Sequence, residues 1–136
     1  MTTSEENKAI VHRYQDALNR NDLDALDDIV AADVKMPNAL LGMPSGLEGA
    51  KLAHQGSAAV FSEWHIRIED MVADDEKVAV RISMSGVHTG PLGDIPPTGK
   101  SFKINGVYFV RIAGGQIVEH WGMGDTTAMM QQLGLA

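Results

Sequence analysis

Hydrophobic positions in the first half of the chain recur at helical spacing. Near the N-terminus they fall on one helical face, at Ile10, Tyr14, Ala17 and Leu18. This pattern predicts a helix over about residues 4–20, with Thr3 and Glu6 at capping-box spacing at its start. A second, shorter helix should follow, and we expect Asn21 to cap it.

A third helix is predicted over about residues 47–62, where apolar residues again fall on one face. Ser45 and Glu48 have the spacing of a second capping box at its start. Before it, residues 34–36 are typical of a short strand, and the prolines and glycines of residues 37–46 indicate a loop.

From Trp64 onward the hydrophobic period changes from about 3.6 to 2, which is typical of half-buried strands. The alternating or extended segments cover about residues 64–68, 78–84, 102–112 and 117–125. Asp74-Asp75 and Gly114-Gly115 have the composition of tight turns between them.

Helices followed by strands argue for an α+β fold, and 136 residues are enough for a single domain that spans residues 1–136. One face of the sheet must be buried, and the N-terminal helices are the cover that the sequence offers. We therefore predict a cone of N-terminal helices packed in a strongly curved antiparallel sheet, whose wide end need not be filled by side chains.

Composition narrows the classes of partner. A net charge of −7 without a basic run makes nucleic acid and anionic membrane surfaces poor electrostatic matches. The chain has no cysteine, which excludes disulfides and thiolate chemistry. No apolar run approaches the roughly 18 residues of a membrane span, and the polar, acidic N-terminus is unlike a signal peptide, so we expect a cytoplasmic protein that acts on a small molecule.

Motifs for metals and nucleotides are missing from the sequence. There is no GxGxxG after a strand, no Walker A and no HExxH. The five histidines are spread along the chain, and Glu119 and His120 are strand neighbours that should point to opposite faces. We therefore expect neither a metal nor a cofactor.

Asp125 is the acidic residue best placed for chemistry. If strand alternation holds, it shares a face with Trp121 and Met123, and burial beside them would raise its pKa and strengthen it as a base. Asp125 also precedes a short helix that ends near Gly134, which makes it a good N-cap. Capping lowers the pKa of a carboxylate and opposes the first role, so both interpretations stay open here.

Three stretches of the chain resemble the SnoaL-like polyketide cyclases of the NTF2-like superfamily. They are GQIVEHW at residues 115–121 followed by Asp125 and the QLG of residues 132–134, the hairpin residues 86–90 and 93–99, and the opening helix with Tyr14, Asn21-Asp22 and Leu26. The resemblance covers nearly the whole chain. It implies the same α+β cone and homodimers or larger homo-oligomers that pair through the outer face of the sheet.

The resemblance also implies a role for Asp125 as a general acid/base. In the characterised cyclases the aspartate at this position removes a proton from an activated carbon of a polyaromatic ester. The resulting enolate attacks a carbonyl of the same molecule, without metal or cofactor. The implied substrate is a small hydrophobic, polyketide-like carbonyl compound, and the implied reaction is an intramolecular aldol cyclisation.

Six further residues are candidates for binding this substrate. They are Tyr14, His54, His88, Asn105, Trp121 and Met123. Tyr14 matches a tyrosine of the first helix that lines the cyclase pocket, His54 would face the pocket mouth, and His88 would donate a hydrogen bond to a substrate carbonyl. Asn105 would supply an amide, while Trp121 and Met123 would line the apolar wall.

Other functions fit the same scaffold. Epoxide hydrolysis in related folds needs two acids around an arginine, a grouping not evident near Arg81 or Arg111. Dehydration or isomerisation would use Tyr14, His54 or His88 together with Asp125. A small-molecule-binding module without catalysis is the alternative from a different class.

Overall fold

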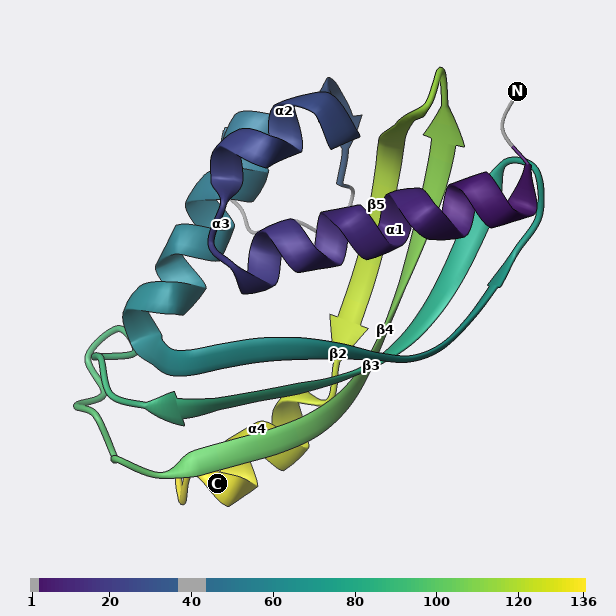
Figure 1. The fold of residues 1–136 in the computed structure, drawn as a ribbon. Coiled ribbons are helices and arrows are strands. Elements are labelled where there is room, and N and C mark those ends of the chain that lie inside the picture. Colours follow the sequence, from purple (N-terminus) through teal and green to yellow (C-terminus); the bar gives the residue numbers. More distant parts are fainter. Residues whose placement is uncertain (1–2, 37–43) are drawn as a thin grey trace.

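The computed structural model describes residues 3–36 and 44–136, and most of the loop predicted at residues 37–46 lies outside them. The elements are α1 (Ser4–Asn19), a 3-10 turn η1 (Leu23–Ala25), α2 (Leu26–Ile29), β1 (Val30–Lys35), α3 (Gly46–Val60), β2 (Phe61–Ala73), β3 (Lys77–His88), β4 (Ser101–Ala113), β5 (Gln116–Gly124) and α4 (Thr126–Gln132) (Figure 1). The predicted α+β class is confirmed, with β1 before α3, the strands β2 to β5 after it, and α4 after β5. No helix among the described residues is long and apolar enough to cross a membrane.

The helix starts were predicted with mixed success. At α1 the Thr3 hydroxyl accepts a hydrogen bond from the Glu6 amide at 3.1 Å, and the Glu6 carboxylate accepts one from the Thr3 amide at 3.4 Å, so this capping box is confirmed. Ser45 precedes α3 but makes no capping hydrogen bond with its side chain, so the second box is wrong. Asp22, not Asn21, caps η1, because Asn21 takes the left-handed φ of 56° at which the chain turns.

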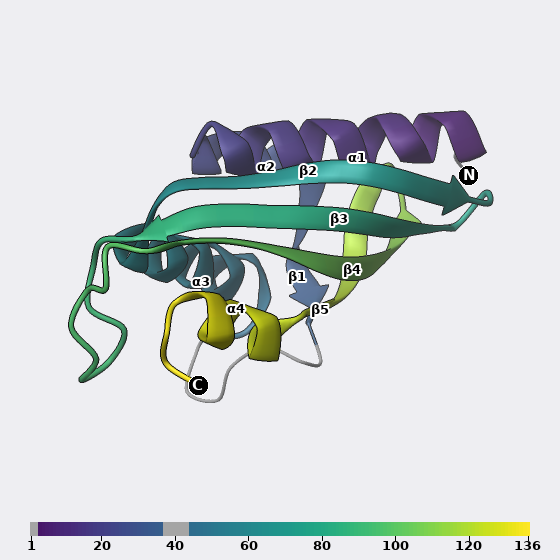
Figure 2. The ribbon, with the colours of Figure 1, turned by 90° about the horizontal axis from the view of Figure 1, so that it is seen from below.

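The five strands form one sheet in the order β1-β5-β4-β3-β2. Strands β2 to β5 are an antiparallel meander, and β1 pairs in parallel with β5. β1 is longer than the short strand predicted and starts at Val30. The sheet curves around α1, with α3 beside β1 and the start of β2, and α4 follows the end of β5 beside β4 (Figures 1 and 2).

We call the sheet face that is buried against the helices the inner face. Along β3 and β4 its buried side chains alternate as predicted and include Val78, Val80, Ile82, Ile104, Tyr108, Val110 and Ile112. Most of them pack against Ile10, Val11 and Ala17 of α1. A smaller cluster around Phe61 and Phe102 packs against Leu133 after α4.

β5 departs from simple alternation at one position. Arg111 pairs with Glu119 and Ile112 pairs with Ile117, so Val118 is an extra residue in β5 opposite β4. Because a bulge moves the following side chains to the opposite face, both Ile117 and His120 lie on the inner face.

Trp121 and Met123 therefore lie on the opposite, outer face of the sheet, with 45% and 76% of their surface exposed. The prediction that Trp121 forms part of the apolar wall of the cone is wrong, whereas Met123, although mostly exposed, still lines one of the cavities on the inner side. The cause of the error is the bulge at Val118, since alternation counted straight from Ile117 puts Trp121 and Met123 inside.

Candidate functional site

Two cavities lie between the helices and the inner face. The first, here called the sheet cavity, has a volume of about 250 Å³ and lies between α1 and strands β2 to β5. The second, the helix cavity, has a volume of about 180 Å³ and lies among α1, α2, α3, β1 and β5. Tyr14, Leu18 and His120 line both cavities, so the two spaces meet at these side chains.

His120 is part of an aromatic cluster at this junction. Its ring stacks on that of Tyr108, with centroids 5.2 Å apart and planes at 23°, and lies 5.9 Å from the ring of Tyr14. The His120 Nδ1 atom is buried and has no hydrogen-bond partner among the described residues. Burial lowers the pKa of His120 to about 4, so the imidazole is neutral near pH 7.

Gln15 brings a second polar group to the sheet cavity. The Tyr108 hydroxyl donates a hydrogen bond to Gln15 Oε1 at 3.1 Å. Gln15 is only 3% exposed, and its Nε2 atom has no partner in the described part of the chain. Burial also raises the pKa of Tyr14 to about 12 and raises that of Tyr108, so both hydroxyls stay protonated.

Glycines on β5 let neighbouring side chains pack closely against the strand. Gly122 and Gly124 both line the sheet cavity. A Cβ atom at position 122 would lie 3.1 Å from His120 Cε1, and one at position 124 would lie 2.7 Å from Met84 Cε. Larger residues at these positions would therefore displace the His120 ring or the Met84 side chain.

Three of the predicted binding residues line these cavities, and one of them, Met123, lines the sheet cavity. Tyr14 lines both, and His54 lines the helix cavity together with Ser57. Burial lowers the pKa of His54, and a hydrogen bond to the Leu18 backbone partly offsets this effect. Their roles in binding a substrate stay predictions.

His88 and Asn105 lie away from both cavities. His88 is fully buried at the far end of β3, where its Nδ1 atom accepts a hydrogen bond from the Thr98 amide at 3.2 Å and its ring lies 5.8 Å from that of Phe61. Asn105 is exposed on the outer face, because it alternates with the buried Ile104 on β4. Neither residue lines the sheet cavity or the helix cavity.

Asp125 is exposed at the end of β5, so the expectation that it is buried is wrong. Its carboxylate accepts a hydrogen bond from the Ala128 amide at 3.0 Å and caps α4, which confirms the capping interpretation. β5 ends at Gly124, so Asp125 lies beyond the strand, where strand alternation no longer sets the direction of its side chain. Asp125 directly follows Gly124, which lines the sheet cavity.

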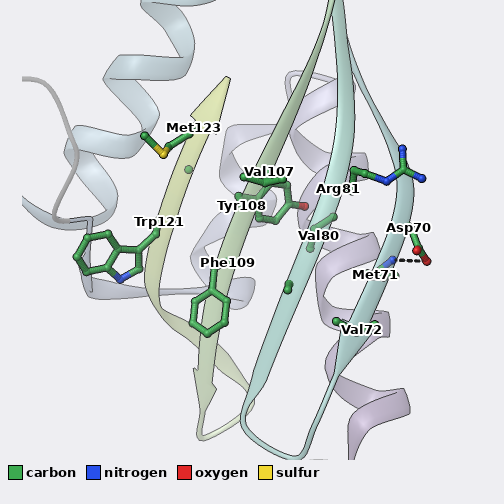
Figure 3. A pocket seen from close by; sticks show the side chains of 12 residues that line it. Asp70, Met71, Val72, Val80, Arg81, Val107, Tyr108, Phe109, Trp121 and Met123 are labelled. Atoms are coloured by element: carbon green, nitrogen blue, oxygen red, sulfur yellow. Dashed lines mark hydrogen bonds between the residues drawn. The ribbon is translucent and has the colours of Figure 1, made fainter. Parts of the chain in front are cut away.

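The outer face carries a broad open hollow of about 650 Å³. Its apolar side chains come from β2, β4 and β5 and include Val72, Val107, Phe109, Trp121 and Met123 (Figure 3). Asp70 and Arg81 stand at one side of it. Its apolar lining side chains are exposed, whereas the inner cavities carry buried polar atoms.

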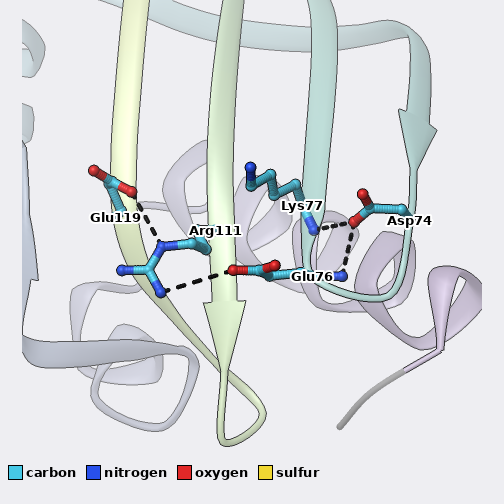
Figure 4. A network of polar contacts seen from close by, with 5 residues as sticks. All are labelled: Asp74, Glu76, Lys77, Arg111 and Glu119. Carbon is cyan, nitrogen blue, oxygen red and sulfur yellow. Dashed lines mark hydrogen bonds and ion pairs between the residues drawn. The ribbon is translucent and has the colours of Figure 1, made fainter.

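A polar network holds the turn between β2 and β3 and the neighbouring strands (Figure 4). Asp74 accepts hydrogen bonds from the amides of Glu76 at 2.8 Å and Lys77 at 2.6 Å, and these bonds lower its pKa. Arg111 donates from Nε to Glu119 at 3.2 Å and lies 4.0 Å from Glu76. All these groups have partners within the network, which is structural in character.

Metal ligands do not gather anywhere in residues 3–36 and 44–136. No group of three or more His, Cys, Asp or Glu side chains there is arranged to hold an ion. The acidic residues at the start of α2 are accordingly a surface feature, as their exposure also indicates.

Gln15 and His120 are the site residues that the sequence reasoning missed. The pattern His120-Trp121-Gly122-Met123-Gly124 contains a usable signal, because it alternates large apolar residues with a histidine and two glycines. A strand that leaves a hollow on one face needs small residues on that face, so the glycine-bearing side was the better choice for a cavity.

Known proteins resemble this chain over nearly its whole length. A profile of the family described as SnoaL-like polyketide cyclase matches residues 8–133. The aklanonic acid methyl ester cyclase DnrD of Streptomyces peucetius is 27% identical over 128 residues, which cover 92% of this chain and 88% of that protein. Wild-type IdmH from Streptomyces antibioticus matches with a TM-score of 0.84 at 29% identity, over 93% of this chain and 97% of the other. TsrD from Streptomyces laurentii shares the fold, with a TM-score of 0.87 at 24% identity over 97% of each chain.

Proposed function

Because the chain belongs to the SnoaL-like polyketide cyclase family, we propose that it is a cofactor-independent enzyme for a small hydrophobic, polyketide-like carbonyl compound. The reaction is proton abstraction from an activated carbon, followed by intramolecular aldol cyclisation. The observation that carries this proposal is the pair of neighbouring inner cavities, which are mostly apolar and contain only uncharged polar groups apart from the histidines.

The cavities suit a flat apolar ligand better than a charged one. Lining side chains such as Leu18, Ile66 and Ile82 are hydrophobic, and no Asp, Glu, Lys or Arg stands among the residues that line them. Ligand pockets typically have volumes of roughly 300–1,000 Å³ and a few placed polar groups. Each inner cavity is smaller than this range, and the side chains of Tyr14, Leu18 and His120 lie between the two.

Asp125 is the proposed general acid/base. The support is its position in the motif that resembles the cyclases and its place next to Gly124 at the wall of the sheet cavity. A substrate with its ring system in the cavity would extend its activated carbon past Gly124 toward the carboxylate. An exposed carboxylate suffices for a carbon acid that an ester and a conjugated ketone already activate.

To test this role, the variant Asp125→Asn is incubated with aklanonic acid methyl ester in heavy water. Asparagine also caps helices, so α4 should keep its start and only the charge is lost. We expect deuterium incorporation and cyclised product, both measured by mass spectrometry, to fall at least about 100-fold while binding changes little. Asp94→Asn, in an exposed loop, is the matched control. An undiminished rate in Asp125→Asn would refute this role.

A binding module without catalysis is the second candidate, and the observation that favours it is the exposed, hydrogen-bonded state of Asp125. Such a protein would bind anthraquinones in a fluorescence titration but exchange no substrate protons. Trials with an epoxide and with a β-hydroxy ketone distinguish epoxide opening and dehydration from cyclisation.

We also propose that the outer face pairs with a second copy of the chain. The support is the broad hollow with its exposed apolar side chains, since patches of this kind are common at protein interfaces. Trp121→Glu should convert a dimer to a monomer in light scattering after gel filtration, whereas His12→Glu on the exposed side of α1 should not. A monomeric wild-type protein at high concentration would contradict the proposal.

A further inference from the structure

The sheet cavity holds two buried side-chain atoms that lack hydrogen bonds within residues 3–36 and 44–136. They are Gln15 Nε2 and His120 Nδ1. A buried polar atom without a partner costs roughly 1–3 kcal/mol, so two in one cavity call for an explanation. A ligand oxygen that accepts hydrogen bonds from both would supply it.

Tyr108 orients both groups. Its hydroxyl donates to Gln15 Oε1 at 3.1 Å, which leaves the NH₂ end of the amide unused. Its ring stacks against the imidazole of His120 at 5.2 Å, which fixes the plane of that ring. A single buried tyrosine, 5% exposed, therefore holds an amide from α1 and an imidazole from β5 at the same cavity.

The surroundings favour an oxygen that gains charge during a reaction over a ligand that is already ionised. Neutral His120 and Gln15 can both donate hydrogen bonds, and no charged side chain stands among the residues that line the sheet cavity. Neutral donors in a mostly apolar site stabilise a developing negative charge without needing to reorganise. Gly122 and Gly124 line the same cavity beside His120.

We propose that Gln15 and His120 bind the carbonyl oxygen of an enolisable aryl ketone and stabilise the enolate that forms from it. This inference rests on the proposed function and names the substrate group that the cavity recognises. Asp125 takes the proton as the C–H bond breaks, and the electron pair moves onto the carbonyl oxygen, which Gln15 and His120 hold without giving up their protons. The enolate carbon then bonds to the second carbonyl carbon, the held oxygen returns to a ketone, and the new alkoxide takes the proton from Asp125.

The test uses alizarin, a flat hydroxyanthraquinone whose absorption changes when its phenol ionises. Binding to the wild-type protein should lower the phenol pKa by about one unit, a tenfold shift in the ionisation constant. Gln15→Met and His120→Phe keep the shapes of these side chains but lack the donors. Each should lose at least half of the shift while the dissociation constant of neutral alizarin changes less than about threefold.

Matched controls separate this role from others. Gln55→Met, on the exposed side of α3, and Asp125→Asn should both keep the full shift, because neither residue touches the proposed oxygen site. Nitrogen NMR of labelled histidine in the wild-type protein needs no variant. It should show that His120 Nδ1 carries a proton and that its signal moves when alizarin binds.

The outcomes are distinct. If alizarin binds with an unchanged phenol pKa, or if both variants keep the full shift, Gln15 and His120 do not hold the oxygen and the inference is overturned, although the cavity still binds aromatics. If alizarin and other anthraquinones do not bind at all, the proposed function fails and the inference fails with it. An NMR signal showing that His120 Nδ1 carries no proton in the complex also overturns the inference.

Discussion

Glu119 and His120 are neighbours in the sequence, yet they lie on opposite faces of the sheet in different environments. On the outer face, Arg111 donates to Glu119 at 3.2 Å and lowers the pKa of that carboxyl group. On the inner face, burial lowers the pKa of His120 to about 4 and leaves its Nδ1 atom unpaired in the described structure. The first group is charged and satisfied, and the second is neutral and unsatisfied.

The contrast separates polar groups whose hydrogen bonds are made within the protein from polar groups that still have unused hydrogen-bonding atoms. Polar groups on the outer side, in the network of Asp74, Arg111 and Glu119, have their hydrogen bonds within the protein and stabilise a turn and a strand pair. Gln15 and His120 keep unused hydrogen-bonding atoms at a cavity. Buried polar atoms without partners are uncommon in stable proteins and are typical of functional sites.

The largest difference between the faces should appear in a matched pair on β4. Val110 is fully buried on the inner face, and Val107 is 53% exposed on the outer face. Val110→Ala should lower the free energy of unfolding by roughly 2–3 kcal/mol, because it removes buried methyl groups and leaves a void. Val107→Ala should change it by less than about 0.5 kcal/mol in dilute solution. Urea denaturation measures both, and equal losses would contradict the assignment of the faces.

His120 should make stability depend on pH. Its pKa in the folded state, about 4, lies below the unfolded value near 6.5, so the unfolded chain binds more protons and stability falls as pH decreases through this window. The loss between about pH 7 and pH 5 should be roughly 2 kcal/mol. His120→Phe should remove this part of the slope, while the carboxylates contribute to both proteins alike. An identical slope in the variant would show that His120 is not buried as described.

The cap at Asp125 should have a smaller effect. Asp125→Ala removes the hydrogen bond to the Ala128 amide and should cost about 1 kcal/mol of stability. Asp125→Asn should cost only a few tenths of that, since asparagine caps equally well. Thermal unfolding of the two variants compares them directly. If both lose the same stability, the charge rather than the cap is responsible.

The ion pair between Arg111 and Glu119 should have the smallest effect. Glu119→Gln keeps the length of the side chain and a hydrogen-bond acceptor, and partly exposed pairs contribute little. We expect a change in the urea midpoint that disappears in high salt. A large, salt-independent loss would instead mean that Glu119 has a role comparable to that of His120.

The fold follows from the sequence because its signals are local and repeated. Val78, Val80 and Ile82 alternate without interruption, and the helices of the first half have one apolar face each, so the α+β cone was predictable. The site was less so. Tyr14 and His54 line the cavities as expected. The face of the sheet on which Trp121 lies depends on the bulge at Val118, and nothing in the sequence at that position indicates a bulge. Whether Gln15 lacks a partner depends on Tyr108, 93 residues away, and no local pattern reports such a contact.

The additional residue at Val118 has a consequence for how this chain should be compared with its relatives. If the same residues paired with β4 without the bulge, the rest of β5 would turn inside out, placing an indole where an imidazole now stands. An alignment that omits the gap at Val118 against a relative without the bulge would therefore match positions of the inner cavities with positions of the outer hollow.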